Sequence, residues 1–182
     1  CHGFDGFSGM ERGESRLVES PQALQNRRKI GGFAGKSALS ETMDFDLERF
    51  VDVPKWFFTA AMEEIRAGRK RTHWMWFVFP QLSGLGRSPL ARRYAMESLA
   101  EAGAFLEHPF LGKRLRDFTQ AVLDTKWCIY EIFPHPDEMK FHSSMTLFAV
   151  ASRGSDPFAE ALSKYFDNRA DRATISLLEE MG

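Results

Sequence analysis

The fold is indicated most clearly by residues 53–68, which read VPKWFFTAAMEEIRAG. Pro54 stands where a first helical turn would begin, a position that suits proline because the missing N–H has no partner there. Gly68 is a typical residue to end a helix. Between them the apolar residues recur at helical spacing, at Val53, Trp56, Phe57, Ala60, Ala61 and Ile65. This stretch therefore predicts an amphipathic helix.

The same spacing recurs farther along the chain. Its apolar positions are Leu111, Leu115, Phe118 and Val122, then Phe158, Ala161, Leu162 and Tyr165, and finally Ile175, Leu177 and Leu178. The last of these helices is expected to be capped near Asp171. The apolar run at 141–150 fits either a helix or a strand. We predict a helix, because no second strand candidate exists to pair with it.

Prolines mark where several of these helices begin. Five of them follow a possible cap or stand just inside a periodic segment: Pro54, Pro89, Pro109, Pro136 and Pro157. Ser88 and Asp156 each supply a side-chain oxygen directly before a proline, as N-cap residues do. The pattern predicts an all-α fold, a single compact multi-helix domain over residues 43–182 with several proline-initiated helices.

Residues 1–42 have a different character. They are rich in Gly, Ser and Arg, their apolar residues are scattered, and the chain opens with Cys1. We interpret them as a disordered extension, translated upstream of a natural start at Met43. The alternative is a flexible arm whose basic run, residues 27–29, contacts an acidic partner.

Composition narrows the classes of function. Of 182 residues, 43% are hydrophobic and 27% charged, which is globular composition, and the formal net charge is −1. That charge gives no general reason to bind nucleic acid or an anionic membrane, so neither partner is expected. The longest apolar run, 74–80, is too short to span a bilayer. Cys128 stands in an apolar run and is expected to be a buried free thiol, in keeping with a cytoplasmic location.

The segment most informative about function is residues 69–94, RKRTHWMWFVFPQLSGLGRSPLARRY. Gly84 and Gly86 permit a tight turn, and Ser88 begins a helix whose N–H groups and dipole favour an anion. Basic residues stand before and after this turn, and the aromatic faces of Trp74 and Trp76 suit a flat ring. The segment predicts an anion site, although a lone GxG turn before a helix is a weak signal.

Structural interpretations compete with this one. Trp76, Phe77 and Phe79 are most simply core residues, whereas Trp74 has polar neighbours and fits either place. The basic run 69–71 is typical of a solvated loop. His73 suits a general acid–base, but a histidine that bonds a nearby carbonyl is commoner.

A second polar group occupies residues 140–146, KFHSSMT. On a helix, Lys140, Ser143 and Ser144 would share a face. This pairing admits a serine–lysine nucleophile, but a serine that bonds a carbonyl one turn back is the commoner explanation. A metal site is not expected, because the histidines have no ligand spacing, and His108 and His135 each precede a proline like turn or cap residues.

The chain resembles a known bacterial family, the domain of unknown function 1810. The shared motifs are RAGRK-x-x-HWMWF-x-FPQ at 66–81, GLG-x-S at 84–88, Tyr94, HP-x-LG-x-RL at 108–115, D-x-MKF at 137–141 and SSMTLF at 143–148. The resemblance covers residues 43–178 in order and implies an all-helical domain without an established activity. Some members carry the label calpastatin, which implies protease inhibition, but such an inhibitor would be disordered. The chain departs from its relatives at 133–136, FPHP, which stiffens that loop.

Three hypotheses follow. The first is a pocket for a phosphorylated or nucleotide-like small molecule, without a cofactor. The second is an enzyme acting on a nucleotide or NAD-derived compound with His73 or Lys140 as acid–base, and the third is a helical protein-interaction module. The candidate ligand-binding residues are Lys70, Arg71, His73, Trp74, Gln81, Gly84, Gly86, Arg87, Ser88, Tyr94, Lys140, Ser143 and Ser144, and the catalytic candidates are His73, Lys140 and Ser143. The first two hypotheses require both polar segments to meet at one pocket.

Overall fold

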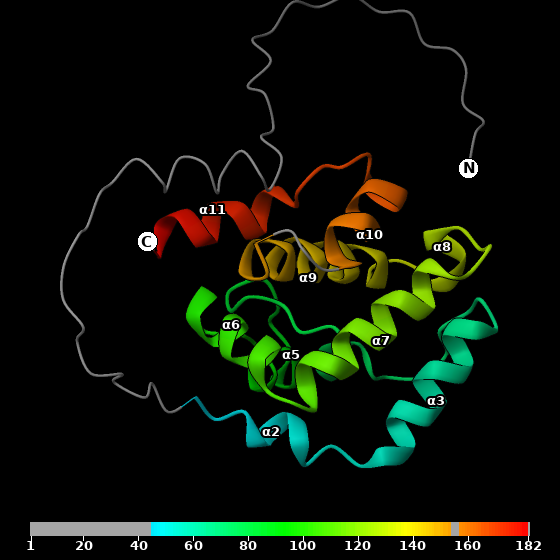
Figure 1. Ribbon diagram of the computed structural model, residues 1–182, viewed down its shortest axis with the longest axis horizontal. Helices are drawn as coiled ribbons and strands as arrows, with labels where there is room; N and C mark the ends of the chain where they lie inside the picture. The colour runs from blue at the N-terminus through cyan, green and yellow to red at the C-terminus, as the bar shows by residue number, and fades with distance from the viewer. Residues whose placement is uncertain (1–44, 154–156, 182) are drawn as a thin grey trace, which may run out of the picture.

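Helix α9 (Asp137–Ala151) runs through the middle of the molecule, with other helices packed around it (Figure 1). The computed structural model describes residues 45–153 and 157–181. Within them the other helices are α2 (Glu48–Val51), α3 (Lys55–Arg66), α4 (Met75–Val78), α5 (Pro89–Arg93), α6 (Leu99–Glu107), α7 (Leu111–Leu123), α8 (Ile129–Ile132), α10 (Pro157–Phe166) and α11 (Arg172–Glu180). The same residues contain no strand, only an isolated bridge between Leu82 and Met96. The predicted all-helical fold is confirmed.

The central position of α9 explains why its sequence was ambiguous. Helices α6, α10 and α11 pack against it, and α4 contacts both α9 and α7. Phe141, Met145 and Phe148 are fully buried, and so are the polar Ser144 and Thr146. A helix covered on several sides has no single apolar stripe. The prediction of a helix over 141–150 is confirmed.

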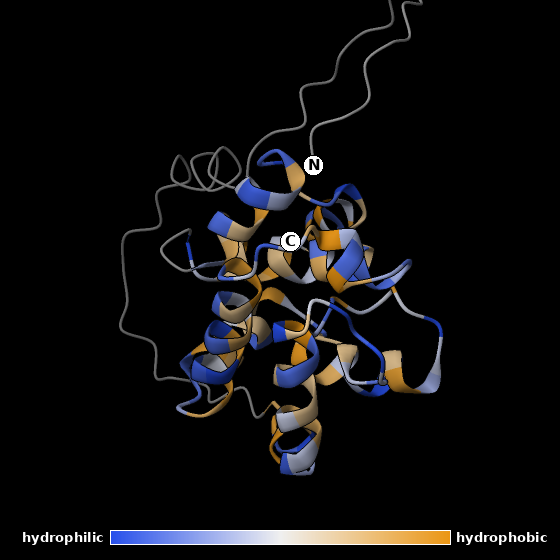
Figure 2. Cartoon of the chain, turned by 90° about the vertical axis from the view of Figure 1, so that its right-hand side faces the viewer, coloured by the Kyte–Doolittle hydropathy of each residue, from blue (hydrophilic) through white to orange (hydrophobic). Residues whose placement is uncertain are grey.

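The outer helices show the expected amphipathic pattern. Leu111, Leu115, Phe118 and Val122 are buried along α7, and Figure 2 shows hydrophilic and hydrophobic residues on different sides of the outer helices. Helix α3 ends at Arg66, and Gly68 follows with a φ of 74°. A side chain at Gly68 would collide with the ring of Trp127, with Cβ 2.4 Å from it. Glycine is thus required there by conformation and by space.

The caps largely agree with the prediction. Pro89 and Pro157 are the first residues of α5 and α10, and Pro54 and Pro136 directly precede α3 and α9. Ser88 Oγ accepts a hydrogen bond from Ala91 N, and Asp171 Oδ2 accepts one from Thr174 N. Asp156, the other predicted cap, lies outside the described residues, as does the proposed extension 1–42.

Two further expectations concern Cys128 and the membrane. Cys128 is a free thiol, but it is only partly buried, because it stands at the N-cap of the short helix α8 rather than inside a helix. Among the described residues, every helix falls short of the length and apolarity that a bilayer span requires.

Candidate functional site

A cleft of about 530 Å³ opens between the turn that leads into α5 and the first turns of α9 and α11. It is lined by Trp76, Gln81, Leu85, Gly86, Arg87, Ser88, Ala91, Pro136, Met139, Lys140, Ser143, Asp171 and Ala173. The lining therefore draws on both polar segments that the sequence singled out. A ligand site formed by both polar segments requires them to meet at one cleft, and they do so here.

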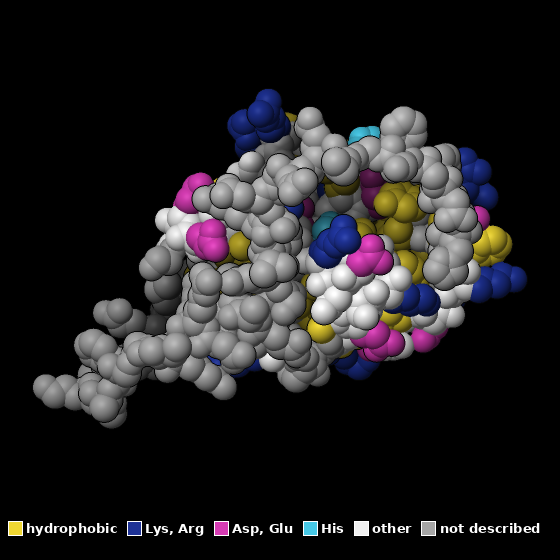
Figure 3. All heavy atoms as spheres, turned by 90° about the horizontal axis from the view of Figure 1, so that it is seen from above, with side chains coloured by type: hydrophobic (Ala, Val, Ile, Leu, Met, Phe, Trp, Pro, Cys, Tyr) yellow, Lys and Arg dark blue, Asp and Glu magenta, His cyan; other side chains and the backbone are white. Residues whose placement is uncertain are grey.

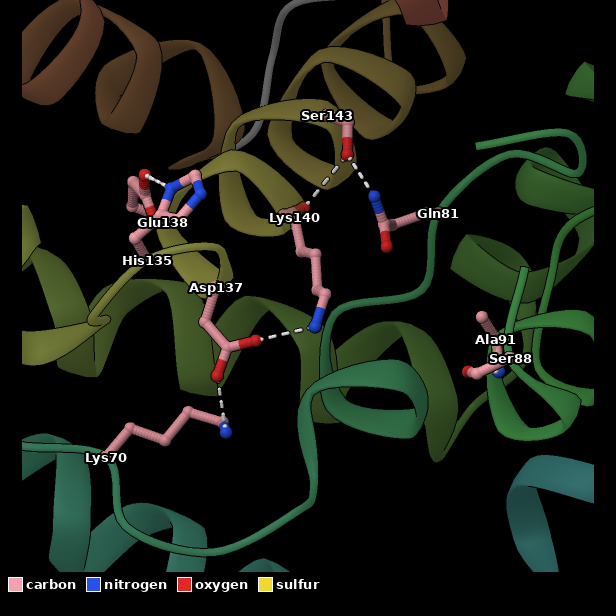
Figure 4. Close-up of polar contacts among 9 residues, drawn as sticks. All are labelled: Lys70, Gln81, Ser88, Ala91, His135, Asp137, Glu138, Lys140 and Ser143. Atoms are coloured by element: carbon pink, nitrogen blue, oxygen red, sulfur yellow. Dashed lines mark hydrogen bonds and ion pairs between the residues drawn. The ribbon is translucent and has the colours of Figure 1, made fainter. Parts of the chain in front are cut away.

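A cluster of three charged side chains adjoins this cleft through Lys140, which is part of the lining. Asp137, the first residue of α9, lies between two lysines (Figure 4). Its Oδ1 is 2.8 Å from Lys140 Nζ, and its Oδ2 is 2.6 Å from Lys70 Nζ. Two ammonium groups thus share one carboxylate, which leaves one positive charge in excess.

The charge state of Asp137 follows from this arrangement. Partial burial by itself would raise the pKa of the carboxyl group, since desolvation disfavours the ionised form. The hydrogen bonds and positive charges of Lys140 and Lys70 outweigh that effect and hold the pKa below its ordinary value. Asp137 is therefore ionised at neutral pH.

The two lysines differ in exposure and in their position relative to the cleft. The Lys70 side chain is only 7% exposed, and its Nζ lies 5.2 Å from the ring centroid of Trp74. The Lys140 side chain is 24% exposed and lines the cleft, with its Nζ 5.0 Å from the ring centroid of Trp76. Each ammonium group lies over an aromatic face, which attracts it. Lys140 therefore brings its positive charge to the cleft, whereas the ammonium group of Lys70 is more deeply buried and contacts the other oxygen of Asp137.

A hydrogen-bond relay joins the two segments across the cleft. Gln81 Nε2 donates to Ser143 Oγ at 2.6 Å, and Ser143 Oγ donates to the carbonyl oxygen of Lys140 at 3.1 Å. The serine proton is committed to that carbonyl, so the amide group facing Ser143 has to be the donor. The amide oxygen of Gln81 then points away from Ser143 (Figure 4). It accepts no hydrogen bond from the residues that the structure describes.

The turn that contains Gly84 and Gly86, called here the glycine turn, packs closely against two helices. Gly84 has a φ of 95°, and a Cβ there would lie 3.4 Å from the side chain of Leu177 in α11. A Cβ on Gly86 would lie 2.4 Å from that of Ala91 in α5. These glycines let the turn approach the two helices. The expected open helix N-terminus is not found, since α5 has five residues and the Ala91 N–H is bonded to Ser88.

Of the predicted ligand residues, some line the cleft and others do not. Gln81, Gly86, Arg87, Ser88, Lys140 and Ser143 line it. Trp74 and Ser144 are fully buried, and Tyr94 packs in the core at 5.5 Å from the ring of Phe50. The lining does not include Arg71, His73 or Gly84, and Lys70 contributes only through Asp137.

Trp74 has a structural role in this arrangement. Its Nε1 donates to Glu64 Oε2 at 2.8 Å. The same carboxylate accepts from the backbone N–H groups of Arg71 and Thr72 and from the Thr72 hydroxyl. Glu64 thereby holds the loop that carries Lys70. Burial by itself would raise the pKa of Glu64, but these hydrogen bonds outweigh it and hold the pKa below its ordinary value.

Sequence reasoning missed several residues of the site. Asp137 stands one helical turn before Lys140, so the spacing of three residues was a usable signal for an ion pair. For Trp76 the sequence allowed both a core position with Phe77 and Phe79 and a face for a flat ring, and only the first of these was preferred; it is half-buried and lines the cleft. Nothing in the local pattern distinguishes it from its buried neighbours.

Histidines and acidic residues are engaged in local structure. His108 Nδ1 accepts from the backbone N–H groups of Phe110 and Leu111, which confirms a capping role. His135 Nδ1 lies 2.8 Å from Glu138 Oε1, and this pair points away from the lysines (Figure 4). Within residues 45–153 and 157–181 no group of His, Cys, Asp and Glu is placed to hold a metal ion.

Comparison with known proteins identifies the family. The sequence profile described as "protein of unknown function (DUF1810)" matches residues 44–178. The chain belongs to the DUF1810 family. A solved structure of the conserved hypothetical protein Rv1873 from Mycobacterium tuberculosis is similar, with 51% sequence identity and a TM-score of 0.72. The similarity covers 74% of this chain and 97% of that one. The comparison with curated proteins found no match.

The DUF1810 match spans every helix that lines the cleft. It includes the turn before α5, all of α9 and the start of α11. The cleft therefore lies within the family domain rather than beside it. In the coloured part of the face seen from above, basic and acidic side chains are interspersed (Figure 3).

Proposed function

We propose that this DUF1810 protein binds a small anionic molecule with a flat apolar ring in the cleft between the α5 turn, α9 and α11. The observation that carries the proposal is the position of Lys140. Its ammonium group lines the cleft, while Lys70 offsets the charge of the carboxylate that it pairs with. The phosphorylated or nucleotide-like ligand expected from the sequence is one member of this class.

The magnitude of the charge effect favours the Lys140 end of the cleft. Two unit charges about 4 Å apart gain about 4 kcal/mol near a protein surface, against about 1 kcal/mol in bulk water. Lys140 is the more shielded cation of the lining, whereas Arg87 is exposed. An anion therefore gains most beside Lys140.

The remaining lining supports a flat ring. Trp76, Leu85 and Met139 provide apolar surface near the ammonium group. Clefts for small molecules are mostly apolar, with a few polar groups that orient the ligand. Lys140 and the free amide oxygen of Gln81 have that character here.

Binding is better supported than catalysis. Ser143 donates its proton to the Lys140 carbonyl and accepts from Gln81, so among the described residues it has no base as a hydrogen-bond partner. His73 is exposed and is not part of the cleft lining. Of the three catalytic candidates, Lys140 is the one that contributes a charged side chain to the cleft lining. The enzyme and the protein-interaction module remain predictions without such support.

A thermal-shift screen tests the proposal. The compounds are nucleotides, NAD derivatives, ADP-ribose and simple aromatic carboxylates. A ligand at 100 times its Kd adds about 2.7 kcal/mol to the free energy of unfolding, which raises Tm by several degrees. We expect at least one compound to do so. An unchanged Tm with the whole panel would refute a binding cleft of this class.

A further inference from the structure

We infer that the ligand anion is a singly charged carboxylate on an aromatic ring rather than a doubly charged phosphate ester, an inference that rests on the proposed binding function. Three properties of the cleft lead to it: the excess charge at Lys140, the number of free hydrogen-bond donors, and the position of an unpaired acceptor.

The charges of the cleft balance one negative charge. Lys70, Lys140 and Asp137 together leave one positive charge. Asp171 brings a further carboxylate to the lining, and it is bonded to Thr174 rather than to a cation. Arg87 is the other cation of the described lining, so Arg87 and Asp171 together add no net charge, and the excess stays at one positive charge. A dianion beside Lys140 would keep one uncompensated charge, and burying such a charge is costly.

The donors near Lys140 are few. A phosphate ester has three terminal oxygens, which protein sites commonly meet with several backbone N–H groups or an arginine fork. Here the Ser143 hydroxyl proton goes to a carbonyl, and the Ala91 N–H goes to Ser88. On the α9 side of the cleft this leaves the ammonium group of Lys140 as the donor. A single ammonium donor suits a carboxylate, which has two oxygens to be bonded rather than three.

The position of the Gln81 amide oxygen, a hydrogen-bond acceptor, also favours a carboxylate over a phosphate ester. The relay through Ser143 orients the amide of Gln81 so that its oxygen is left without a donor from the described residues. This oxygen would repel phosphoryl oxygens placed near Lys140. A carboxylate with only two oxygens can keep clear of it, and an N–H or O–H group on the ring would be bound by it.

Three ligands with one ring test the inference: naphthoate, naphthyl phosphate and the neutral naphthalenemethanol. Calorimetric titration of the full chain at pH 8 would compare them, because the second pKa of a phosphate ester is about 6 and the ester is then doubly charged. We expect naphthoate to bind about tenfold more tightly than either of the others, a difference of about 1.4 kcal/mol. Equal or tighter binding of naphthyl phosphate would overturn the inference and leave the binding function intact. Failure of all three to bind would overturn this inference, and the thermal-shift panel would then decide the binding function separately.

A variant at Lys70 isolates the charge argument. In Lys70→Met the remaining pair of Lys140 and Asp137 is neutral, so naphthoate should lose its advantage over naphthalenemethanol while the Kd of the alcohol stays within about twofold. Lys70→Arg should restore the advantage. Lys113→Met is the matched control, since Lys113 is an exposed lysine paired with Asp117 on α7. A preference for naphthoate over naphthalenemethanol that persists in a folded Lys70→Met protein contradicts the inference. If Lys70→Met does not fold, the comparison of the three ligands on the unaltered chain decides the inference.

Discussion

Gln81 and Ser143 stand 62 positions apart in the chain, and their side chains form a hydrogen bond of 2.6 Å. This bond joins the turn before α5 to the central helix α9. It also fixes which end of the Gln81 amide faces the cleft, because the serine hydroxyl is already a donor to the Lys140 carbonyl.

The first prediction concerns this bond. Gln81→Met and Ser143→Ala should each lower the free energy of unfolding, and a double-mutant cycle should give a coupling energy of about 1 kcal/mol, typical of a hydrogen bond between neutral groups. Urea unfolding of the three variants measures it. A coupling energy near zero would mean that the contact does not hold the two segments together.

Lys140 should determine the affinity for anions. Lys140→Gln removes the charge that faces the cleft, so a Tm increase produced by an anionic ligand should shrink or vanish, corresponding to about a tenfold weaker Kd. Lys113→Gln should respond to the ligand like the unaltered chain, because its side chain is 73% exposed and lies outside the lining. An unchanged ligand response in Lys140→Gln would place the anion elsewhere.

Replacement of Asp137 should lower the free energy of unfolding but raise the affinity for a doubly charged anion. Asp137→Asn leaves the nearly buried ammonium group of Lys70 without its partner and should cost about 2 kcal/mol, as for hydrogen bonds to charged groups. It also leaves two positive charges at the cleft, so naphthyl phosphate should bind about tenfold more tightly. Urea unfolding and calorimetry measure the two effects. Weaker binding of the phosphate ester would contradict this account of the charges.

Glu64 should make stability depend on pH in the acidic range. Its pKa in the folded protein lies below the ordinary value of a glutamate, so the ionised carboxylate contributes stability above the unfolded pKa, and this contribution is lost as the pH falls through the folded pKa. Glu64→Gln should cost about 1–2 kcal/mol at pH 7, because it weakens the bonds to the loop at 71–74. The difference between the two proteins should narrow as the pH is lowered. A difference that is the same at pH 7 and at pH 3 would exclude this role.

The glycine turn offers a matched pair of substitutions. Gly86→Ala places a Cβ 2.4 Å from that of Ala91 and should destabilise the protein by about 1–3 kcal/mol, the cost of overpacking. Gly103→Ala lies within α6, where a Cβ meets nothing within 4 Å, and should stabilise it by about 0.5–1 kcal/mol. Thermal unfolding of both variants gives the comparison. Tolerance of alanine at Gly86 would show that the turn does not pack closely on α5.

Much of the fold was predictable because helices are specified by local sequence. The spacing of Leu111, Leu115 and Phe118 identifies the buried side of α7 without knowledge of its neighbours. Ser88 and Asp171 act as caps as their local sequence suggests. The two polar segments could be recognised by composition alone, and they do converge on one cleft.

The roles of individual side chains in the cleft depended on the tertiary structure. Trp74 and Trp76 stand two positions apart in one aromatic run, but the first is fully buried against Glu64 and the second faces the cleft beside Lys140. No periodicity separates them, because α4 is only four residues long and the helices around it decide which side is covered. The sequence by itself determined the helices, their caps and the presence of two polar segments. Only the tertiary structure decided that Lys70 would join the local pair of Asp137 and Lys140, because Lys70 and Asp137 stand far apart in the chain and their spacing carries no signal.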